Sequence, residues 1–449
     1  MKLLLSKFSS PRTLNYLRQI QGSFVFKLLA VLMSFLLVPL MVKFLGNEKY
    51  GIWSTLLTLV SWTLFFDFGL ANGTRNKVAE AFAKNDYDEA RVYISTSYIS
   101  ITVISSVMFF GLCLFGLWID WQAVFNTNIL SSKELRLIVI IISFYILANF
   151  ILSIINQIFH SIQKTSFVIF GQFLTNFLSV FFVYILLKIS SGKMIFLAIT
   201  FGLPIILTSF LLNFYYFKNN LNLLPKIKYF NTSKIKDLLG LGVKFFVIQL
   251  AVLVIFTTDK IIITQILGPE HVTPYDITFK LFSMITILHG LINDPLWSAY
   301  TEAYIKKDFS WIKKSCLRMT LLLLPVFAIV LILIFTSKLI IKIWVGPQVI
   351  VPDQLIIFFG IFTIISIWNN NWGIILSGIG KVRLGTCYTV VTGLINIPLS
   401  VYFAHKFGVA GVILGTICSI SISSVISPIQ VWYFIFSKKQ FHQLERIFS

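Results

Sequence analysis

Long apolar runs alternate with short polar segments from one end of the chain to the other. A helix of about 20 apolar residues is long enough to cross the hydrocarbon core of a bilayer. About twelve such runs can be drawn, near residues 23–44, 51–70, 92–119, 137–159, 168–187, 194–217, 243–266, 274–298, 319–341, 355–376, 386–407 and 409–436. The pattern therefore predicts an all-α polytopic membrane protein without a long soluble domain.

Two short segments between the apolar runs recur 222 residues further along the chain. FLGNE at 44–48 corresponds to ILGPE at 266–270, and AEAFAKND at 79–86 corresponds to TEAYIKKD at 301–308. Both matches share one offset and one place relative to the apolar runs. This agreement indicates a duplicated membrane protein.

Basic residues set the predicted orientation. When the N-terminus is placed inside, most loop Lys and Arg residues fall on the inner side. Because basic loops stay in the cytoplasm, both termini are predicted to be cytoplasmic, and each half then begins inside, as in parallel repeats. We expect two six-helix lobes related by a pseudo-two-fold axis along the membrane normal, joined by a cytoplasmic connector and followed by a cytoplasmic tail. Their ranges are 1–217 and 243–436 for the lobes, 218–242 for the connector and 437–449 for the tail.

Composition supports the membrane interpretation and excludes several function classes. The 449 residues are 57% hydrophobic and 12% charged, with a mean hydropathy of +0.87, whereas soluble domains average about 25% charged. The net charge of +20 is best explained by loop residues that fix the topology, so no nucleic-acid partner is expected. None of the four cysteines lies in a predicted outside loop, so we expect no disulfide, metal site or cofactor. No Walker A or HExxH motif is present.

Basic residues inside or beside the spans are candidates for binding an anion. A charge within a span costs about 2.5–3.5 kcal/mol, so each needs a reason. Lys27 either snorkels to the surface or meets an anionic headgroup. Lys260 and Lys280 lie at similar predicted depths, where they either form a phosphate site or pair with Asp259. Arg75 either belongs to the basic inner loops or attracts an anionic lipid.

Titratable groups in the spans are candidates for ion coupling or for a gate. At the 222-residue offset, Asp67 corresponds to His289, and Asp294 lies at the inner end of the same span as His289. Asp259 is a further acid within a span. These four groups either carry a coupling ion, H⁺ or Na⁺, or serve helix packing and topology.

One predicted span carries the sequence Trp-Asn-Asn-Asn-Trp near mid-membrane. Three consecutive amides cover about 200° of a helix, so at least one of them should face an interior. Amides beside indole rings suit sugars, and the alternative is amide bonding between helices. The residues are Trp368, Asn369, Asn370, Asn371 and Trp372.

The segments FLGNEKYGIW at 44–53 and FFDFGLANGTRNKVAEAFAKND at 65–86, followed by Ala90–Arg91, resemble the Wzx-type polysaccharide flippases. These transporters of O-antigen and capsule repeat units belong to the multidrug/oligosaccharidyl-lipid/polysaccharide exporter superfamily. The resemblance implies two lobes around a cavity lined by cationic residues. In this chain, Lys27, Lys260 and Lys280 would be those residues. It also implies alternating access, a bacterial inner-membrane location and a substrate oligosaccharide linked to undecaprenyl diphosphate. Membrane lipid, a coupling ion and a glycan polymerase are the expected partners.

Two other functions remain open at this point. A cation-coupled multidrug exporter of the same superfamily would favour acids in its cavity, so Asp67 and Asp259 agree with it while the lysines oppose it. A membrane glycosyltransferase or glycan polymerase would be an enzyme. The short outside loops, of which 120–136 is the longest, argue against an enzyme.

Overall fold

The computed structural model describes residues 11–67, 69–190, 192–239, 257–294, 296–381 and 383–436. All regular elements in these ranges are helical, as the hydropathy pattern predicts. Within the described residues, ten helical stretches are long and apolar enough to cross a membrane, and they overlap every predicted run except 51–70 and 243–266. The chain is therefore an all-helical, multi-pass membrane protein.

The predicted span at 51–70 stays a prediction, because its helix changes character along its length. Helix α3 (Asn47–Ser61) has 15 residues, a length of about 22 Å that alone does not cross a hydrocarbon core of about 30 Å. A 3₁₀ turn, η1 (Trp62–Asp67), follows it, and Gly69 then takes a left-handed φ of 85° before α4 (Leu70–Ala83) begins. Glycine adopts this φ without steric strain, so the backbone breaks here although the sequence stays apolar.

The predicted span at 243–266 lies largely outside the described residues. Residues 240–256 are not described, and residues 257–267 are helical. The total of twelve spans therefore stays a prediction.

The chain divides into two compact units by its internal contacts. The first contains Met1–Gly46 and Leu56–Phe246, and the second contains Asn47–Thr55 and Val247–Ser449. The first turns of α3 thus belong to the second unit. The predicted lobes and their pseudo-two-fold relation stay a prediction.

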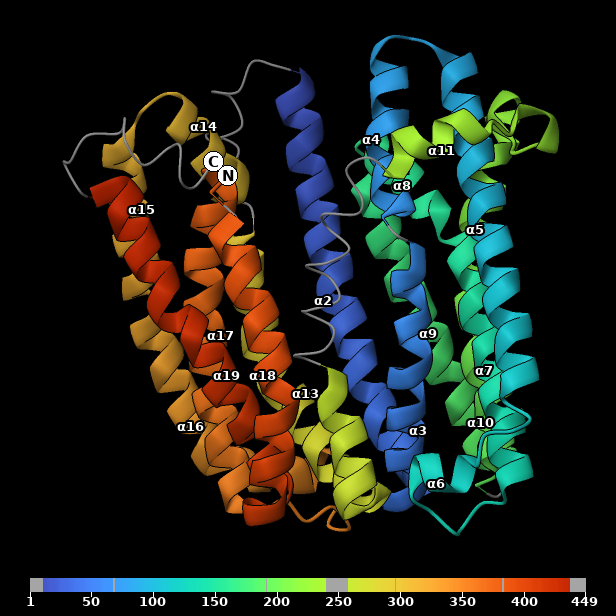
Figure 1. Ribbon diagram of the computed structural model, residues 1–449, viewed down its shortest axis with the longest axis vertical. Coiled ribbons are helices and arrows are strands. Elements are labelled where there is room, and N and C mark those ends of the chain that lie inside the picture. Colours follow the sequence, from blue (N-terminus) through green and yellow to red (C-terminus); the bar gives the residue numbers. More distant parts are fainter. Residues whose placement is uncertain are drawn as a thin grey trace. The chain divides into compact units, whose positions relative to one another are not determined.

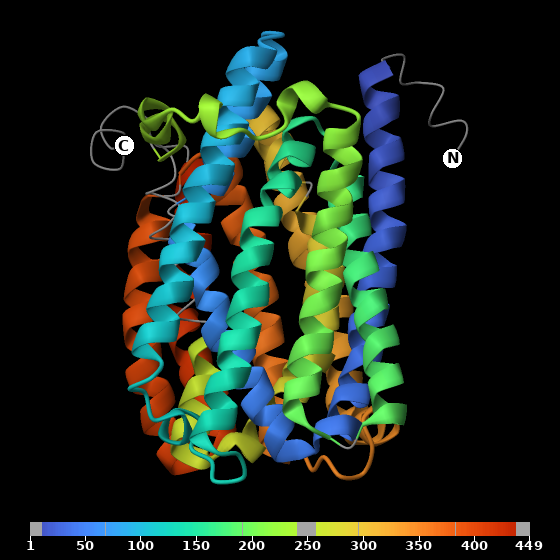
Figure 2. The ribbon, with the colours of Figure 1, turned by 90° about the vertical axis from the view of Figure 1, so that its right-hand side faces the viewer.

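In the first unit, α7 packs against both α5 and α10, and the three helices run side by side (Figures 1 and 2). Helix α9 packs against α2 and α10. A buried cluster from α4, α5, α7, α8 and α10 forms the core at one end of this unit. The helices are α2 (Pro11–Leu45), α4 (Leu70–Ala83), α5 (Tyr87–Phe115), α6 (Trp121–Phe125), α7 (Ser132–Leu152), α8 (Ile154–Ser161), α9 (Thr165–Ile189), α10 (Met194–Lys218) and α11 (Thr232–Leu239).

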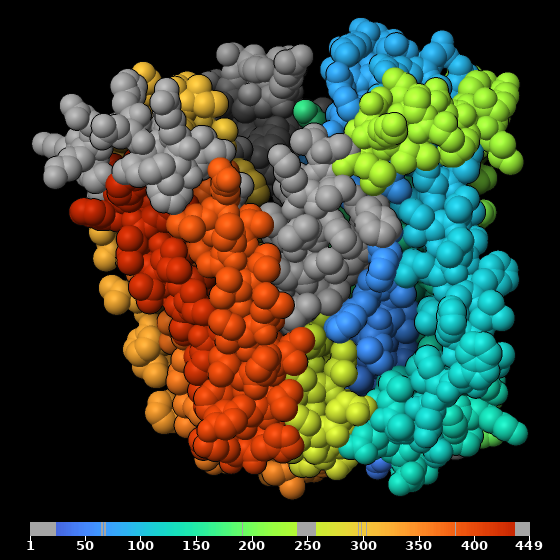
Figure 3. Space-filling model, in the orientation of Figure 1, coloured from blue at the N-terminus to red at the C-terminus, as the bar shows by residue number. Residues whose placement is uncertain are grey.

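The predicted connector packs on α4 and α5 of the first unit through two 3₁₀ turns, η2 (Leu221–Leu223) and η3 (Ile227–Tyr229), and α11. Figure 3 shows this segment in light green over the end of α5. The ammonium of Lys234 lies 3.1 Å from the carboxylate of Glu89. A Cβ placed on Gly73 would lie 2.1 Å from the carbonyl oxygen of Leu238, so only glycine permits this approach of α11 to α4.

In the second unit, α19 packs against α17 and α18, and α17 also contacts α13, α14 and α16. Side chains from α14, α15 and α17, together with Val431 and Ile435, form a buried cluster around Tyr300 and Ile312. The elements are η4 (Pro269–His271), α13 (Val272–Asn293), α14 (Leu296–Ile305), α15 (Phe309–Leu321), α16 (Leu323–Trp344), α17 (Asp353–Gly378), α18 (Arg383–Phe407), α19 (Val409–Val431) and the π-helical turn η5 (Trp432–Phe436).

The segments that recur in the sequence form the same turns in the two units. Gly46 and Gly268 both take a positive φ before the next helix begins, at 75° and 104°. Asn85 and Lys307 both lie in the left-handed region, at 57° and 58°. The aspartates that follow, Asp86 and Asp308, cap α5 and α15 by accepting from the backbone N–H three residues on, at 2.8 and 3.0 Å.

Candidate functional site

Lys260 and Lys280 converge on one carboxylate in the second unit. Lys260 Nζ lies 2.5 Å from Asp276 Oδ1, and Lys280 Nζ lies 2.7 Å from Asp276 Oδ2. The Asp276 side chain is 1% exposed, whereas the two lysines are 22% and 37% exposed. Lys280 lies four residues after Asp276 on α13, so both project from one face of the helix. The three groups together carry a net charge of +1.

Two hydroxyl groups from the start of α3 complete this ion cluster. Tyr50 donates its hydroxyl hydrogen to Asp276 Oδ2 at 2.7 Å and accepts from Lys280 Nζ at 2.7 Å. Lys260 also donates to Ser54 Oγ at 2.9 Å. We refer to Tyr50, Ser54, Lys260, Asp276 and Lys280 as the ion cluster. The sequence interpretation missed Asp276, although its i, i+4 spacing to Lys280 was a usable signal.

Asp259 is not the partner of either lysine, so the predicted alternative pairing is wrong. Its carboxylate, 4% exposed, accepts a short hydrogen bond from Tyr275 and one from Thr416 at 3.1 Å. Thr416 in turn accepts from Asn396 Nδ2 at 3.1 Å. Asp259 therefore sits in a hydroxyl and amide network on α13, α18 and α19, with no cation paired to it in the described ranges.

The remaining ion-coupling candidates are distributed along α13 and η1. His289 is buried, and neither ring nitrogen has a hydrogen-bond partner within the part of the chain that is described. Asn371 of α17 lies beside this ring, and Asn293, one turn after His289, is also buried with its amide unpartnered. Asp294 is exposed at the end of α13. The side chain of Asp67 lies outside the described residues, so its correspondence to His289 stays a prediction.

The Trp-Asn-Asn-Asn-Trp segment connects α17 to its neighbours. Trp368 Nε1 donates to the backbone of Ser424 at 2.9 Å, and Asn369 donates to the backbone of Ile420 at 3.2 Å, both on α19. Asn371 donates to Met319 of α15 at 3.4 Å. Amide bonding between helices thus accounts for these donors, while the amide oxygens of Asn369 and Asn371 are buried without a partner in the described residues. The Trp372 ring meets that of Trp368 edge to face, with centroids 5.2 Å apart, and Asn370 is exposed.

Lys27 and Arg75 lie in the first unit. Lys27 Nζ on α2 donates to Gln172 Oε1 on α9 at 3.2 Å, so this ammonium is bound to a neutral partner. Arg75 is exposed on α4. On the same helix, hydrogen bonds from Lys84 and Lys77 lower the pKa of Glu80 to about 2. Arg75 therefore lies on the exposed face of a helix that carries charges of both signs.

Comparison with known proteins places this arrangement in a family. A curated protein of Yersinia pseudotuberculosis named for O-antigen export is 21% identical over 407 residues, which cover 88% of this chain and 91% of that protein. A curated protein of Salmonella typhimurium named as an O-antigen transporter is 24% identical over 396 residues, covering 86% of this chain and 89% of that protein.

Solved structures share the fold. A structure described as the inward-facing conformation of a multidrug resistance MATE family transporter of the MOP superfamily superposes with a TM-score of 0.78. It covers 93% of this chain and 98% of its own at 13% identity, which shows likeness of fold alone. The family model described as polysaccharide biosynthesis protein matches residues 17–296. Because this match spans more than half of the chain, the protein belongs to the polysaccharide biosynthesis protein family.

Proposed function

We propose that this protein is a flippase that moves an oligosaccharide repeat unit, linked to undecaprenyl diphosphate, from the cytoplasmic to the periplasmic leaflet of the bacterial inner membrane. The observation that carries the proposal is the length of the similarity to proteins named for O-antigen transport, 88% and 86% of this chain. In this proposal both termini are cytoplasmic, and two six-helix lobes alternate access to the substrate. A glycan polymerase would take the unit after transfer.

The diphosphate of the substrate would be held by ammonium groups. Lys260 and Lys280 are the best candidates, because Asp276 already holds their Nζ atoms within 2.7 Å of a single carboxylate. A diphosphate offers more oxygens than a carboxylate, so it can replace Asp276 as their partner. Lys27 and Arg75 of the first unit would provide the earlier contacts on the cytoplasmic side.

The sugars of the substrate would meet α17. Asn370 is exposed, and the buried amide oxygens of Asn369 and Asn371, which have no hydrogen-bond partner in the described residues, would accept from sugar hydroxyls where alternating access uncovers them. Trp368 and Trp372 offer flat apolar faces beside these amides. This role uses the amide atoms that interhelical bonding leaves unused.

Coupling to an ion gradient is the further part of the proposal. Asp259 is a buried carboxylate whose partners are hydroxyls rather than a cation, so it can take up H⁺ or Na⁺ without breaking an ion pair. His289, with two unpartnered ring nitrogens, is the second candidate. Asp294 and Asp67 would act with it at the cytoplasmic ends of their helices.

The proposal is tested by deleting the gene, staining cell-surface glycan and extracting lipid-linked precursors. Loss of surface glycan with complete lipid-linked repeat units trapped on the cytoplasmic side is expected. Intact glycan together with new drug sensitivity would refute the proposal in favour of a cation-coupled multidrug exporter. Incomplete or unpolymerised units would instead indicate a glycosyltransferase or polymerase.

A further inference from the structure

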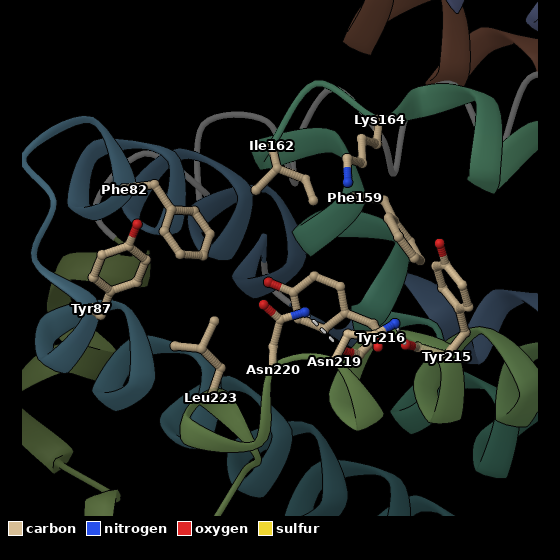
Figure 4. A pocket seen from close by; sticks show the side chains of 10 residues that line it. All are labelled: Phe82, Tyr87, Phe159, Ile162, Lys164, Tyr215, Tyr216, Asn219, Asn220 and Leu223. Atoms are coloured by element: carbon tan, nitrogen blue, oxygen red, sulfur yellow. Dashed lines mark hydrogen bonds between the residues drawn. The ribbon is translucent and has the colours of Figure 1, made fainter.

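A cavity of about 390 Å³ lies at one end of the first unit, where α4, α8, α9 and α10 meet (Figure 4). This volume is within the range of small-molecule sites, about 300–1,000 Å³. The cavity opens beside the turns that connect α4 to α5 and α8 to α9, which the basic-residue pattern assigns to the cytoplasmic side. None of the candidate residues considered above lines it.

The walls of this cavity are mainly aromatic. Phe82, Phe159, Tyr215 and Tyr216 all line it. Phe159 is fixed from two sides, because its ring stacks on Phe167 with centroids 5.0 Å apart and meets Tyr216 edge to face at 5.6 Å. The cavity therefore presents flat apolar surfaces that are already held in place.

Polar groups at the cavity have hydrogen-bonding capacity to spare. The amides of Asn219 and Asn220 donate to the backbone carbonyls of Tyr215 and Tyr216, at 3.1 and 2.8 Å. Each asparagine thus keeps its Oδ1 oxygen as an acceptor. The Tyr216 hydroxyl has no hydrogen-bond partner within the described part of the chain, and the Lys164 ammonium has no ion-pair partner there. Figure 4 shows both side chains at the cavity.

This combination selects a ligand that both donates and accepts hydrogen bonds. A phosphate only accepts, so the two asparagine oxygens would repel it. A sugar hydroxyl accepts from Lys164 and Tyr216 and donates to Asn219 or Asn220, while the apolar face of its ring lies against the aromatic walls. We propose that the cavity binds one sugar residue of the lipid-linked oligosaccharide as it arrives from the cytoplasmic side. The identity of the ligand as part of the transported substrate rests on the proposed function.

The test uses the full chain in detergent micelles and saturation-transfer difference NMR. The probes are the methyl glycosides of glucose, galactose, mannose and N-acetylglucosamine. At least one probe should bind with a dissociation constant in the millimolar range. Tyr216→Phe and Lys164→Gln should each weaken binding by about three- to tenfold, the loss of one hydrogen bond. Both changes keep the size of the side chain, and elution as a monodisperse peak verifies folding.

Matched control variants lie at the far end of α9. Tyr184 is half exposed with Lys188 over its ring at 4.9 Å, so Tyr184→Phe and Lys188→Gln make the same chemical changes away from the cavity. They should leave probe binding unchanged. The inference is overturned if no probe shows a saturation-transfer signal. It is also overturned if the wild type, Tyr216→Phe and Lys164→Gln bind a probe equally well. Binding of glycerol 1-phosphate in place of the glycosides, abolished by Lys164→Gln, overturns it as well.

Failure of this inference is distinct from failure of the proposed function. If lipid-linked units are trapped in the deletion strain but the protein binds no glycoside, the sugar-binding role of the cavity is refuted and the flippase function is supported. The purified protein could instead bind a glycoside in a way that depends on Tyr216 and Lys164, while the deletion strain keeps normal surface glycan. That result supports a sugar site and refutes the flippase.

Discussion

Replacing Asp276 with asparagine should strongly destabilise the second unit. The carboxylate is 1% exposed and is the shared partner of Lys260, Lys280 and Tyr50. Asparagine keeps one acceptor oxygen but turns an NH₂ group toward one of these donors. The substitution therefore removes a negative charge from between two ammonium groups and leaves a donor facing a donor.

The magnitude follows from the contacts that are lost. Two close ion-pair contacts at 2.5 and 2.7 Å are lost, and interactions of this kind with a charged group contribute about 1.5–3 kcal/mol each. Truncating one partner of a buried ion pair costs about 3–5 kcal/mol. Because the lysines are 22% and 37% exposed, water can solvate their ammonium groups in the variant and reduce this loss. We expect a net destabilisation of about 3 kcal/mol, which lowers the melting temperature by about 5–10 °C.

The assay is thermal unfolding of purified protein followed by intrinsic fluorescence, with Asp353→Asn as the matched control. Asp353 pairs with Lys338 at 2.6 Å, but the two side chains are 73% and 58% exposed. The control therefore makes the same chemical change in a solvent-screened ion pair, which is worth about 0–1 kcal/mol. Equal melting temperatures for the two variants would refute the view that Asp276 is the structural centre of the ion cluster.

Four further predictions concern other contacts. Asp276→Asn should also raise the affinity for inorganic pyrophosphate about tenfold, because the net charge of the ion cluster rises from +1 to +2. Isothermal titration calorimetry measures this affinity, and an unchanged value would exclude Lys260 and Lys280 from a phosphate site. Gly51→Ala should lower stability by about 2–3 kcal/mol, because a Cβ would lie 1.7 Å from the Pro269 carbonyl oxygen. The control Gly111→Ala, whose Cβ would have nothing within 4 Å, should stabilise by about 0.5–1 kcal/mol. Equal shifts in melting temperature would contradict the close contact at Gly51. Hydrogen bonding to Glu89, and then to Tyr93, raises the pKa of Lys234. The contribution of Lys234 to stability is therefore present below the unfolded pKa of about 10.4 and is lost only at higher pH. Protection of the α11 amides from hydrogen exchange should be constant from about pH 6 to 9, and it should be reduced over this whole range in Lys234→Met. Asn370→Ala should leave stability within about 0.5 kcal/mol of wild type but lower the amount of surface glycan. Asn369→Ala should lose about 0.6 kcal/mol of stability, because it removes a hydrogen bond to α19. Normal surface glycan in Asn370→Ala would exclude Asn370 from the sugar path.

Hydropathy and repeat patterns predicted the all-helical fold and most of the helices. They missed the break between α3 and α4, because Trp62–Asp67 is as apolar as a spanning helix and hydropathy does not register backbone conformation. Gly69 was the only local sign of that break, and one glycine in an apolar run is weak evidence.

The candidate site was predicted in part. That Lys260 and Lys280 lie close together followed from their depth in consecutive spans, and the structure brings them together on Asp276. The contributions of Tyr50 and Ser54 could not be predicted, since both lie more than 200 residues away in the chain. The same holds for the contact of Lys27 with Gln172 on another helix. Long-range partners of this kind depend on how helices pack, which periodicity alone does not determine.

The two matching turns bear on how this chain evolved. At the 222-residue offset, the turn glycines and the capping aspartates agree, because backbone geometry admits few alternatives. The ion cluster does not agree: the counterparts of Lys260, Asp276 and Lys280 are Val38, Ser54 and Thr58. One ancestral half thus retained or acquired charges that the other half lacks. In transporters built by duplication, positions where the copies disagree are therefore the better guide to chemistry, and positions where they agree are the better guide to folding.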